Sequence, residues 1–179
     1  DRLYLNNGGG DFTFQSNALP AFTESGSLVT AADYDQDGDL DLFVGGRIFP
    51  GAYPKPVTSR ILANNGNGIF KDVTAEVCRE LENFGLIKSA LWTDYNNDGW
   101  FDLIVAAEWQ AITIFKNERG KLSNATAKSG LADKIGWWNS LSGGDFDADG
   151  DTDYIVGNLG LNTKFKATAK NPVEIFARD

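Results

Sequence analysis

The chain has 179 residues, of which 42% are hydrophobic and 12% aromatic, a composition typical of one globular domain. Its formal net charge of -9 argues against nucleic-acid binding, because phosphate recognition needs clustered Lys and Arg. The sequence contains no apolar run of 18 residues, so no transmembrane helix is predicted. The absence of His removes the usual catalytic triads, and a single cysteine, Cys78, excludes an internal disulfide.

Short apolar runs separated by Asp, Asn and Gly predict strands from the first residues onward. Residues 3–6 and 11–14 flank an Asn-Asn-Gly turn, and we interpret residues 1–27 as the tail of a preceding repeat unit. Two fuller units are predicted at residues 28–76 and 86–127, and a partial one, with the start of the next, at residues 136–179.

A nine-residue acidic pattern occurs three times, beginning at Asp33, Asp94 and Asp145. Each copy places oxygen-bearing side chains at positions 1, 3, 5 and 9, and glycine at position 6, where a sharp turn is needed. Ca2+ takes six to eight oxygen ligands, and position 7 can supply its backbone carbonyl, which would explain a Trp there in the second copy. The pattern therefore predicts up to three Ca2+ ions, one in each loop.

The predicted metal ligands are the side chains and position-7 carbonyls of all three copies. They are Asp33, Asp35, Asp37, Asp39, Asp41, Asp94, Asn96, Asp98, Trp100, Asp102, Asp145, Asp147, Asp149, Asp151 and Asp153. Ordinary Asp/Gly turns are the alternative for any one copy, but three copies that each lead into an apolar strand favour a metal. An EF-hand is excluded because position 12, which needs Glu, is Val44, Val105 or Val156. Asn96 lowers the charge of the second loop, so we expect it to be the weakest site.

Each unit reads as strand, metal loop, strand, turn, strand, Asn/Gly turn and strand. In the second unit the strands are predicted at residues 88–95, 101–108, 111–116 and 122–126. Four short antiparallel strands in about 50 residues are typical of a propeller blade, so the predicted fold is all-β, an incomplete β-propeller of about three blades. We expect residues 173–179 to restart a strand, with Asp179 at the start of another loop.

The combination of acidic loop and apolar strands resembles the FG-GAP repeat of integrin α-subunit propellers. The stretch Asn64–Thr74 is similar to related VCBS-type repeats. Further stretches resemble large secreted or surface-attached VCBS-repeat proteins of bacteria, namely Gly45–Arg47, Pro50–Pro54, Ala106–Trp109, Gly136–Ser140 and Gly157–Asn162. The resemblance implies an extracellular or cell-surface location. Since propellers close at roughly four to eight blades, we expect the remaining blades of the same propeller or a partner chain to complete this one. The sequence contains no Met, so we expect the chain to be an excised or mature piece of a longer protein.

Six residues between or at the ends of predicted strands are candidates for binding a ligand. They are Arg47, Tyr53, Glu108, Trp109, Trp137 and Trp138. The alternative for the aromatic residues is packing between blades. The alternative for Glu108 is a solvated acid in a loop, and the alternative for Arg47 is an ion pair with an acidic side chain. The predicted function is a Ca2+-stabilised module that binds a protein or a glycan. The alternative is that the chain is part of a lyase-like, polysaccharide-processing enzyme. The sequence does not decide whether the chain is an enzyme, but it favours a binding function over catalysis.

Overall fold

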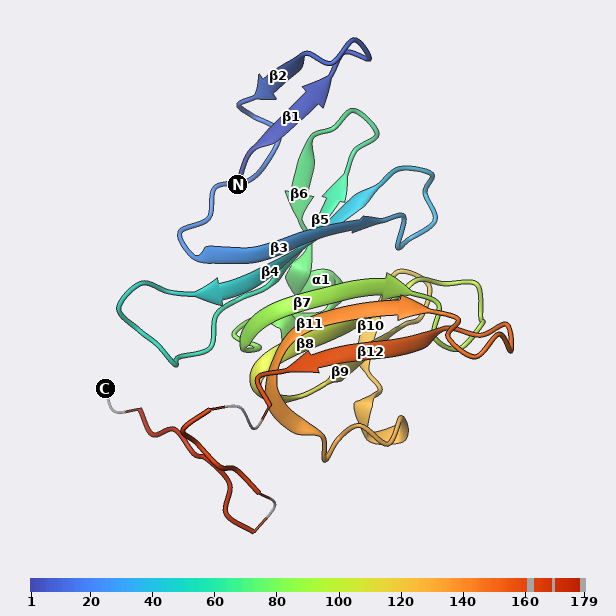
Figure 1. The fold of residues 1–179 in the computed structure, drawn as a ribbon. Coiled ribbons are helices and arrows are strands. Elements are labelled where there is room, and N and C mark those ends of the chain that lie inside the picture. The colour runs from blue at the N-terminus through green and yellow to red at the C-terminus, as the bar shows by residue number, and fades with distance from the viewer. Residues whose placement is uncertain (161–162, 169, 178–179) are drawn as a thin grey trace.

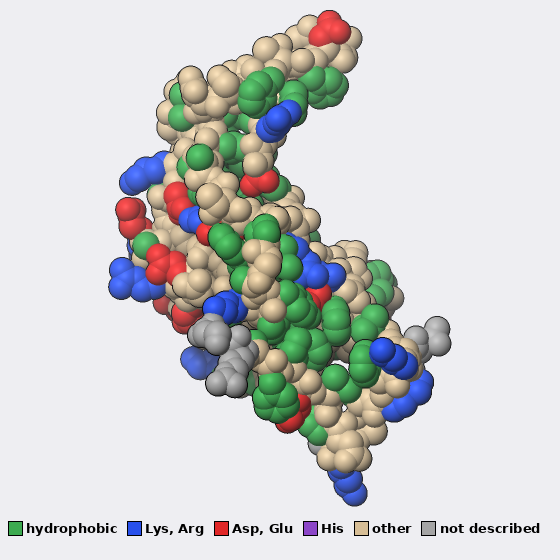
Figure 2. All heavy atoms as spheres, turned by 90° about the vertical axis from the view of Figure 1, so that its left-hand side faces the viewer, with side chains coloured by type: hydrophobic (Ala, Val, Ile, Leu, Met, Phe, Trp, Pro, Cys, Tyr) green, Lys and Arg blue, Asp and Glu red, His purple; other side chains and the backbone are tan. Residues whose placement is uncertain are grey.

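The computed structural model describes residues 1–160, 163–168 and 170–177, and its regular secondary structure is almost entirely antiparallel strands (Figure 1). Strands β1 (Leu3–Asn6) and β2 (Phe12–Gln15) form a separate hairpin. Figure 2 shows this hairpin extending from the body of the molecule above a hollow, on a face where apolar side chains gather. The described helices are far too short to cross a bilayer.

The first complete unit is a four-stranded sheet in chain order. It contains β3 (Ser25–Ala32), β4 (Asp41–Ile48), β5 (Arg60–Asn64) and β6 (Phe70–Asp72). Strands β3 and β4 flank the first acidic loop, as the repeat pattern predicts. The fourth strand is followed by two short helices that the sequence reading did not anticipate, α1 (Thr74–Val77) and η1 (Arg79–Leu81).

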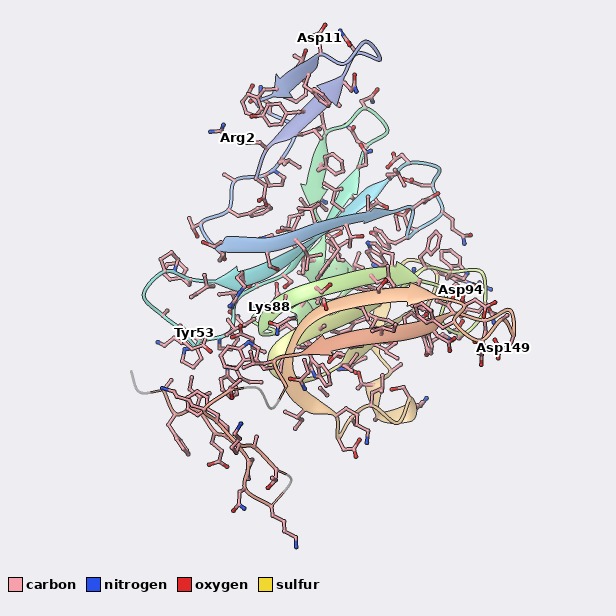
Figure 3. All side chains as sticks on the ribbon, viewed as in Figure 1. Arg2, Asp11, Tyr53, Lys88, Asp94 and Asp149 are labelled. Carbon is pink, nitrogen blue, oxygen red and sulfur yellow. The ribbon has the colours of Figure 1, made fainter. Side chains whose placement is uncertain are left out.

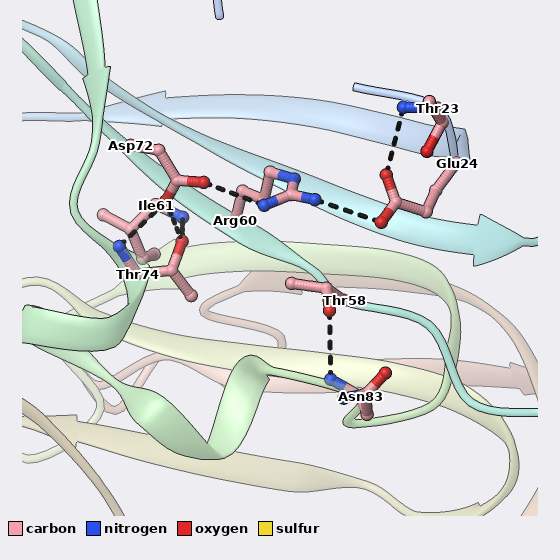
Figure 4. A network of polar contacts seen from close by, with 8 residues as sticks. All are labelled: Thr23, Glu24, Thr58, Arg60, Ile61, Asp72, Thr74 and Asn83. Carbon is pink, nitrogen blue, oxygen red and sulfur yellow. Dashed lines mark hydrogen bonds and ion pairs between the residues drawn. The ribbon is translucent and has the colours of Figure 1, made fainter. Parts of the chain in front are cut away.

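A network of ion pairs and hydrogen bonds connects β5 and β6 with the residue that precedes β3 (Figure 4). The Arg60 guanidinium pairs with Asp72 at 2.8 Å and with Glu24 at 3.1 Å. Asp72 also accepts the hydroxyl of Thr74 at 2.6 Å, and that hydroxyl accepts the backbone N–H of Ile61 at 3.0 Å. The network therefore joins the segment before β3 to β5, β6 and α1 through charge-assisted hydrogen bonds.

The second unit repeats the same strand order. It contains β7 (Leu86–Thr93), β8 (Asp102–Ala111), β9 (Thr113–Asn117) and β10 (Leu122–Asn124), and a short helix η2 (Thr126–Lys128) follows. All four predicted strands are present, with shifted ends. The all-β fold of antiparallel four-stranded sheets is thus confirmed, whereas the boundaries of the units and their total number stay predictions.

The third acidic loop lies between β11 (Ile135–Gly144) and β12 (Asp153–Asn158). The start of β11 also pairs with the end of β8, at Gly136 and Gln110, so β7 to β12 form one six-stranded sheet. This continuity arises because β8 runs three residues further than predicted. The strand expected from residue 173 is absent through residue 177, and Asp179 lies outside the described residues.

The two units pack face to face around an apolar core. Side chains on alternate residues of β8 point to opposite faces, so Leu103 and Val105 pack toward the first unit while Ile104 packs toward β11 and β12. Fully buried Phe43 and Phe115 fill the first core, where burying each side chain stabilises the fold by roughly 1.5–3 kcal/mol. The rings of Tyr34 and Trp92 stack beside them, 5.9 Å apart.

Two glycines that lie opposite each other in β3 and β4 give a stability test. A Cβ on Gly46 would overlap the Thr58 carbonyl oxygen and lie 2.9 Å from Val57 Cγ2, whereas a Cβ on Gly26 has no neighbour closer than 3.6 Å. We expect Gly46→Ala to lower the free energy of unfolding by about 1–3 kcal/mol in urea denaturation, because overpacking forces the backbone to shift. The matched Gly26→Ala should change it by less than about 0.5 kcal/mol. Equal losses in the two variants would contradict this packing.

Candidate metal loops and a buried polar cluster

The three acidic loops share one pattern of internal hydrogen bonds. In the first loop, the N–H of Asp37 donates to Asp33 Oδ1 at 3.1 Å and to Asp35 Oδ1 at 3.3 Å, and the N–H of Gly38 donates to Asp33 Oδ2 at 3.2 Å. The position-7 N–H, from Asp39, donates to Asp37 at 3.1 Å. The same four bonds recur in the second and third loops, so the chain itself gathers the side chains of positions 1, 3 and 5.

The backbone of each loop turns through two left-handed residues. Glycine at position 6 has φ between 87° and 98° in all three copies, as the sequence predicts. Position 4 is also left-handed, with φ of 62° at Gln36, 56° at Asn97 and 64° at Ala148, and the sequence reading missed this. Only Asn carries a sequence signal for this conformation, and for Ala148 it costs on the order of 1 kcal/mol.

In the first and third loops the carboxylates converge. One oxygen each of Asp33, Asp35 and Asp37 lies within 4.8 Å of the others, and Asp145, Asp147 and Asp149 form an equivalent triad. Burial, followed by repulsion from Asp37, raises the pKa of the Asp35 carboxyl above its ordinary value. An all-oxygen triad whose charges repel one another is suited to a hard divalent cation.

The second loop differs from its neighbours in charge. Asn96 replaces the middle carboxylate, and the Lys116 ammonium lies 3.4 Å from Asp98 Oδ2. A fixed positive charge at this distance competes with a metal ion for the same carboxylate. Trp100, at position 7, donates its backbone N–H to Asp98 at 3.1 Å, as Asp39 and Asp151 do in their own loops.

The position-9 aspartates of the first two loops are fully buried and connect each loop to its own sheet. Asp41 Oδ1 accepts the backbone N–H of Asn64 at 2.8 Å, and Asp102 Oδ1 accepts that of Asn117 at 2.6 Å. Burial raises the pKa of both carboxyl groups to about 6. Asp41 Oδ2 and Asp39 Oδ1 are buried without a hydrogen-bond donor in the described part of the chain. In the third loop, Asp153 Oδ2 accepts the N–H of Phe146 at 3.0 Å.

Hydrogen bonds also connect the first loop to the second unit. The Gln36 side-chain amide donates to the Gly99 carbonyl at 2.7 Å. The Asn117 amide donates to the carbonyls of Tyr34 at 2.7 Å and Phe101 at 2.8 Å. The first acidic loop is therefore hydrogen-bonded both to the second acidic loop and to the end of the third strand of the second unit.

A second group of polar residues lies at the opposite end of the sheets from the loops, as the labels of Tyr53 and Lys88 in Figure 3 show. Its centre is Glu108, whose side chain is fully buried. Glu108 Oε1 pairs with Arg47 at 2.7 Å and with Lys88 at 3.3 Å, and Oε2 accepts the Tyr53 hydroxyl at 3.1 Å. Two cations and a hydroxyl compensate the buried carboxylate. The interpretation of Glu108 as a solvated loop acid is therefore wrong, because the extended β8 carries it between the two units.

Two tryptophan side chains extend this polar group through Tyr53. Trp109 Nε1 donates to the Tyr53 hydroxyl at 3.0 Å, and the Trp109 ring lies 5.0 Å from that of Trp137. Trp109 has φ of 64°, an uncommon conformation for a bulky residue. Trp138 lies elsewhere: it packs on the Ile104 core and donates its Nε1–H to the Lys134 carbonyl at 3.1 Å. The structure thus brings five of the six ligand candidates together and adds Lys88, whose only sequence signal is a charge inside an apolar strand.

Comparison with known proteins agrees with the repeat pattern. The family model described as an FG-GAP-like repeat matches residues 1–44 and 94–156, more than half of the chain. A search of curated proteins found no match. The matched residues include all three acidic loops and the strands β3, β8, β11 and most of β12. The chain therefore belongs to the FG-GAP-like repeat family.

Proposed function

We propose that this chain is an extracellular Ca2+-binding module of a β-propeller whose ions are structural and whose opposite edge binds a ligand. The observation that carries the proposal is the identical hydrogen-bond pattern of three loops, two of which gather a carboxylate triad. Ca2+ would be held by positions 1, 3 and 5 of each loop, with Asn96 as the middle ligand in the second. Bound Ca2+ supplies positive charge that offsets the repulsion among these carboxylates.

An extracellular location is supported by the Ca2+ affinity that is typical of such loops. Ca2+ sites of extracellular modules have Kd values on the order of 0.1–1 mM, and such sites fill outside cells, where Ca2+ is millimolar. FG-GAP repeats are typical of extracellular proteins, which supports the same location. We therefore place the protein outside the cell or on its surface, and we propose a bacterial source from the resemblance of its longer sequence stretches.

Removing one carboxylate from the first triad tests the structural role of the ion. We expect Asp35→Ala to lower the free energy of unfolding by about 1.4 kcal/mol when Ca2+ is at ten times its Kd, because the variant loses the contribution of ion binding. In chelator the variant should melt close to the original protein, because relief of the repulsion at Asp35 is offset by loss of the hydrogen bond that Asp35 accepts from the Asp37 N–H. Thermal unfolding under both conditions measures the difference.

The matched control is Asp133→Ala, which removes an exposed aspartate outside the loops that pairs with its neighbour Lys134. It should unfold like the original protein with and without Ca2+. If Asp35→Ala lost the same stability in chelator as in Ca2+, Asp35 would not be a ligand.

The ligand surface that we propose is formed by Tyr53, Trp109 and Trp137. Tyr53 is 41% exposed, and the two Trp side chains are half-buried, so the aromatic faces are held by packing and by the bond between Trp109 and Tyr53. Rigid aromatic side chains with a polar tip favour binding surfaces. Sugar rings stack on such faces, so we propose a glycan as the first ligand class to test, and a protein as the second.

A glycan array probed in millimolar Ca2+ and again in chelator tests this surface. We expect binding that needs Ca2+ and is reduced about 5- to 30-fold by Trp137→Ala, since a stacked aromatic ring contributes on the order of 1–2 kcal/mol. Phe101→Ala removes an exposed aromatic ring at position 8 of the second loop, at the opposite end of the sheets, and keeps the backbone carbonyl that accepts the Asn117 amide, so this variant should bind like the original protein. Silence from a folded sample would exclude glycans and leave a protein ligand, whereas equal effects of both variants would contradict the position of the surface.

The structure favours binding over the lyase-like alternative. A catalytic base must come within hydrogen-bond reach of the substrate proton. The side chain of Glu108, the carboxylate closest to the aromatic surface in sequence, is fully buried against Arg47, Lys88 and Tyr53. We therefore assign Glu108 a positioning role, in which it holds Arg47 and Tyr53 beneath the surface.

A further inference from the structure

The polar group around Glu108 carries more positive charge than its carboxylate needs. Glu108 Oε1 pairs with Arg47 at 2.7 Å and with Lys88 at 3.3 Å, so two cations share one oxygen of a single carboxylate. The other oxygen accepts the hydroxyl of Tyr53 at 3.1 Å, which brings no charge. Glu108 is the one acidic partner of both cations among the described residues. Two cations and one carboxylate therefore leave one positive charge uncompensated.

The unused hydrogen-bonding capacity of this group lies on its cations. The Tyr53 hydroxyl already donates to Glu108 and accepts from Trp109 Nε1 at 3.0 Å. Arg47 Nη1 is buried without an acceptor in the described part of the chain. The ammonium group of Lys88 has three N–H donors, and Glu108 is its one described partner. The group is therefore short of acceptors, and an anionic ligand supplies an acceptor and the missing charge together.

The cations can be reached from solvent, whereas the carboxylate cannot. The side chains of Arg47 and Lys88 are 26% and 24% exposed, and that of Glu108 is 0% exposed. Lys88 and Tyr53 contact the two oxygens of the same carboxylate, so the ammonium group lies beside the aromatic surface. A ligand on that surface therefore meets positive charge, because the carboxylate that offsets part of it stays covered.

Lys88 occupies a β-bulge that recurs in the other units. The register of β7 against β8 shifts between Ile87 and Ser89, so Lys88 has no partner residue across the pair. Equivalent shifts leave Ser27 unpaired between β3 and β4, and Asn139 unpaired between β11 and β12. The bulge therefore does not require a cation. Since a bulge re-aims the side chain that it carries, in the second unit it directs an ammonium group to this end of the sheets.

The partner position is also free of any charge requirement in the repeat. Arg47 and Glu108 each follow the position-9 aspartate of their own loop by six residues, and Leu159 has this place in the third unit. A cation, an anion and an apolar residue thus occupy equivalent positions. The charged group is a feature of the first two units of this chain, and the repeat fold does not demand it.

We propose that the aromatic surface formed by Tyr53, Trp109 and Trp137 binds an acidic glycan. A sugar ring stacks on the aromatic side chains, while the carboxylate or sulfate group of the sugar pairs with Lys88. Each of these groups is a singly charged oxyanion and matches the one uncompensated positive charge. The acidic loops lie at the opposite end of the sheets, away from this surface (Figure 3). The inference rests on the proposed function, since it names the class of glycan that the same surface takes.

An acidic peptide offers the same charge, but its carboxylates stand on flexible side chains without a rigid ring beside them. An acidic sugar holds its oxyanion on or next to the ring that stacks. The short connection from Trp109 through Tyr53 and Glu108 to Lys88 places an aromatic face and a cation side by side, which favours the sugar.

Pairs of glycans that differ only in charge test this inference on the full chain in millimolar Ca2+. The array carries uronate oligosaccharides with their methyl esters, sulfated oligosaccharides with their desulfated forms, and polyglutamate. We expect an acidic glycan to bind, and its neutral partner to bind at least about tenfold more weakly, because a charge-assisted hydrogen bond is lost. The pair that responds shows whether the oxyanion is a carboxylate or a sulfate.

Two lysine variants locate the charge. Lys88→Gln should weaken binding of the acidic glycan about tenfold, and Arg47 still compensates the buried Glu108 in this variant. Lys88→Arg keeps the charge and should bind nearly as tightly as the original protein. The matched control is Lys71→Gln, which removes one positive charge from an exposed ion pair with Glu76 on β6. It should bind like the original protein.

The outcomes separate this inference from the proposed function. Equal binding of the acidic and neutral members of every pair would overturn the inference and leave the glycan surface standing. Silence of all glycans from a folded sample would overturn both, and binding of polyglutamate alone would assign the surface to an acidic peptide instead. Equal losses in Lys88→Gln and Lys71→Gln would also overturn the inference, because overall charge would then explain the attraction. The comparison within each pair uses the original protein and does not depend on the folding of a variant.

Discussion

Buried carboxylates at the starts of β4 and β8 hold the first two acidic loops onto their own sheets. Asp41 and Asp102 accept the backbone N–H of an asparagine that ends the third strand of the same unit. A charge-assisted bond of this kind is stronger than a neutral one and fixes the loop, the second strand and the following turn together. The remaining carboxylates of the loop can then converge, because the backbone that carries them is already oriented.

The same arrangement couples neighbouring units. Asn117 bonds both to its own loop and to the Tyr34 carbonyl of the first loop, and Gln36 reaches the backbone of the second. These hydrogen bonds connect the order of one loop to the contact between the two sheets, so an ion that ordered a loop would also stabilise that contact. At the other end of the sheets the fully buried Glu108 joins Arg47 of the first unit to Lys88 of the second. The chain thus has a polar connection at each end of a common apolar core.

The features that could be predicted from the sequence are those set by a local pattern of residues. The acidic repeats, the glycines at position 6 and the alternating apolar strands all follow from rules that act within a few residues. The burial of Glu108 could not be predicted, because Arg47 and Tyr53 lie more than 50 residues earlier in the chain and β8 runs further than its apolar pattern indicates. The left-handed Ala148 carries no sequence signal, since alanine does not favour that conformation, and it lies in a turn where the Asp149 N–H donates to Asp145 and Asp147. Trp137 and Trp138 are adjacent in β11, so their side chains point to opposite faces and only one joins the aromatic surface.

The central claim is that three loops of one geometry each hold a structural Ca2+ ion. Native mass spectrometry of the chain during chelator titration counts these ions directly. The account predicts three bound Ca2+ ions per chain in the absence of chelator. One ion should leave first, from the second loop, because Asn96 and the Lys116–Asp98 pair weaken its hold there. A chain that carries no Ca2+ at millimolar concentration, or that releases all its ions together, would contradict the account.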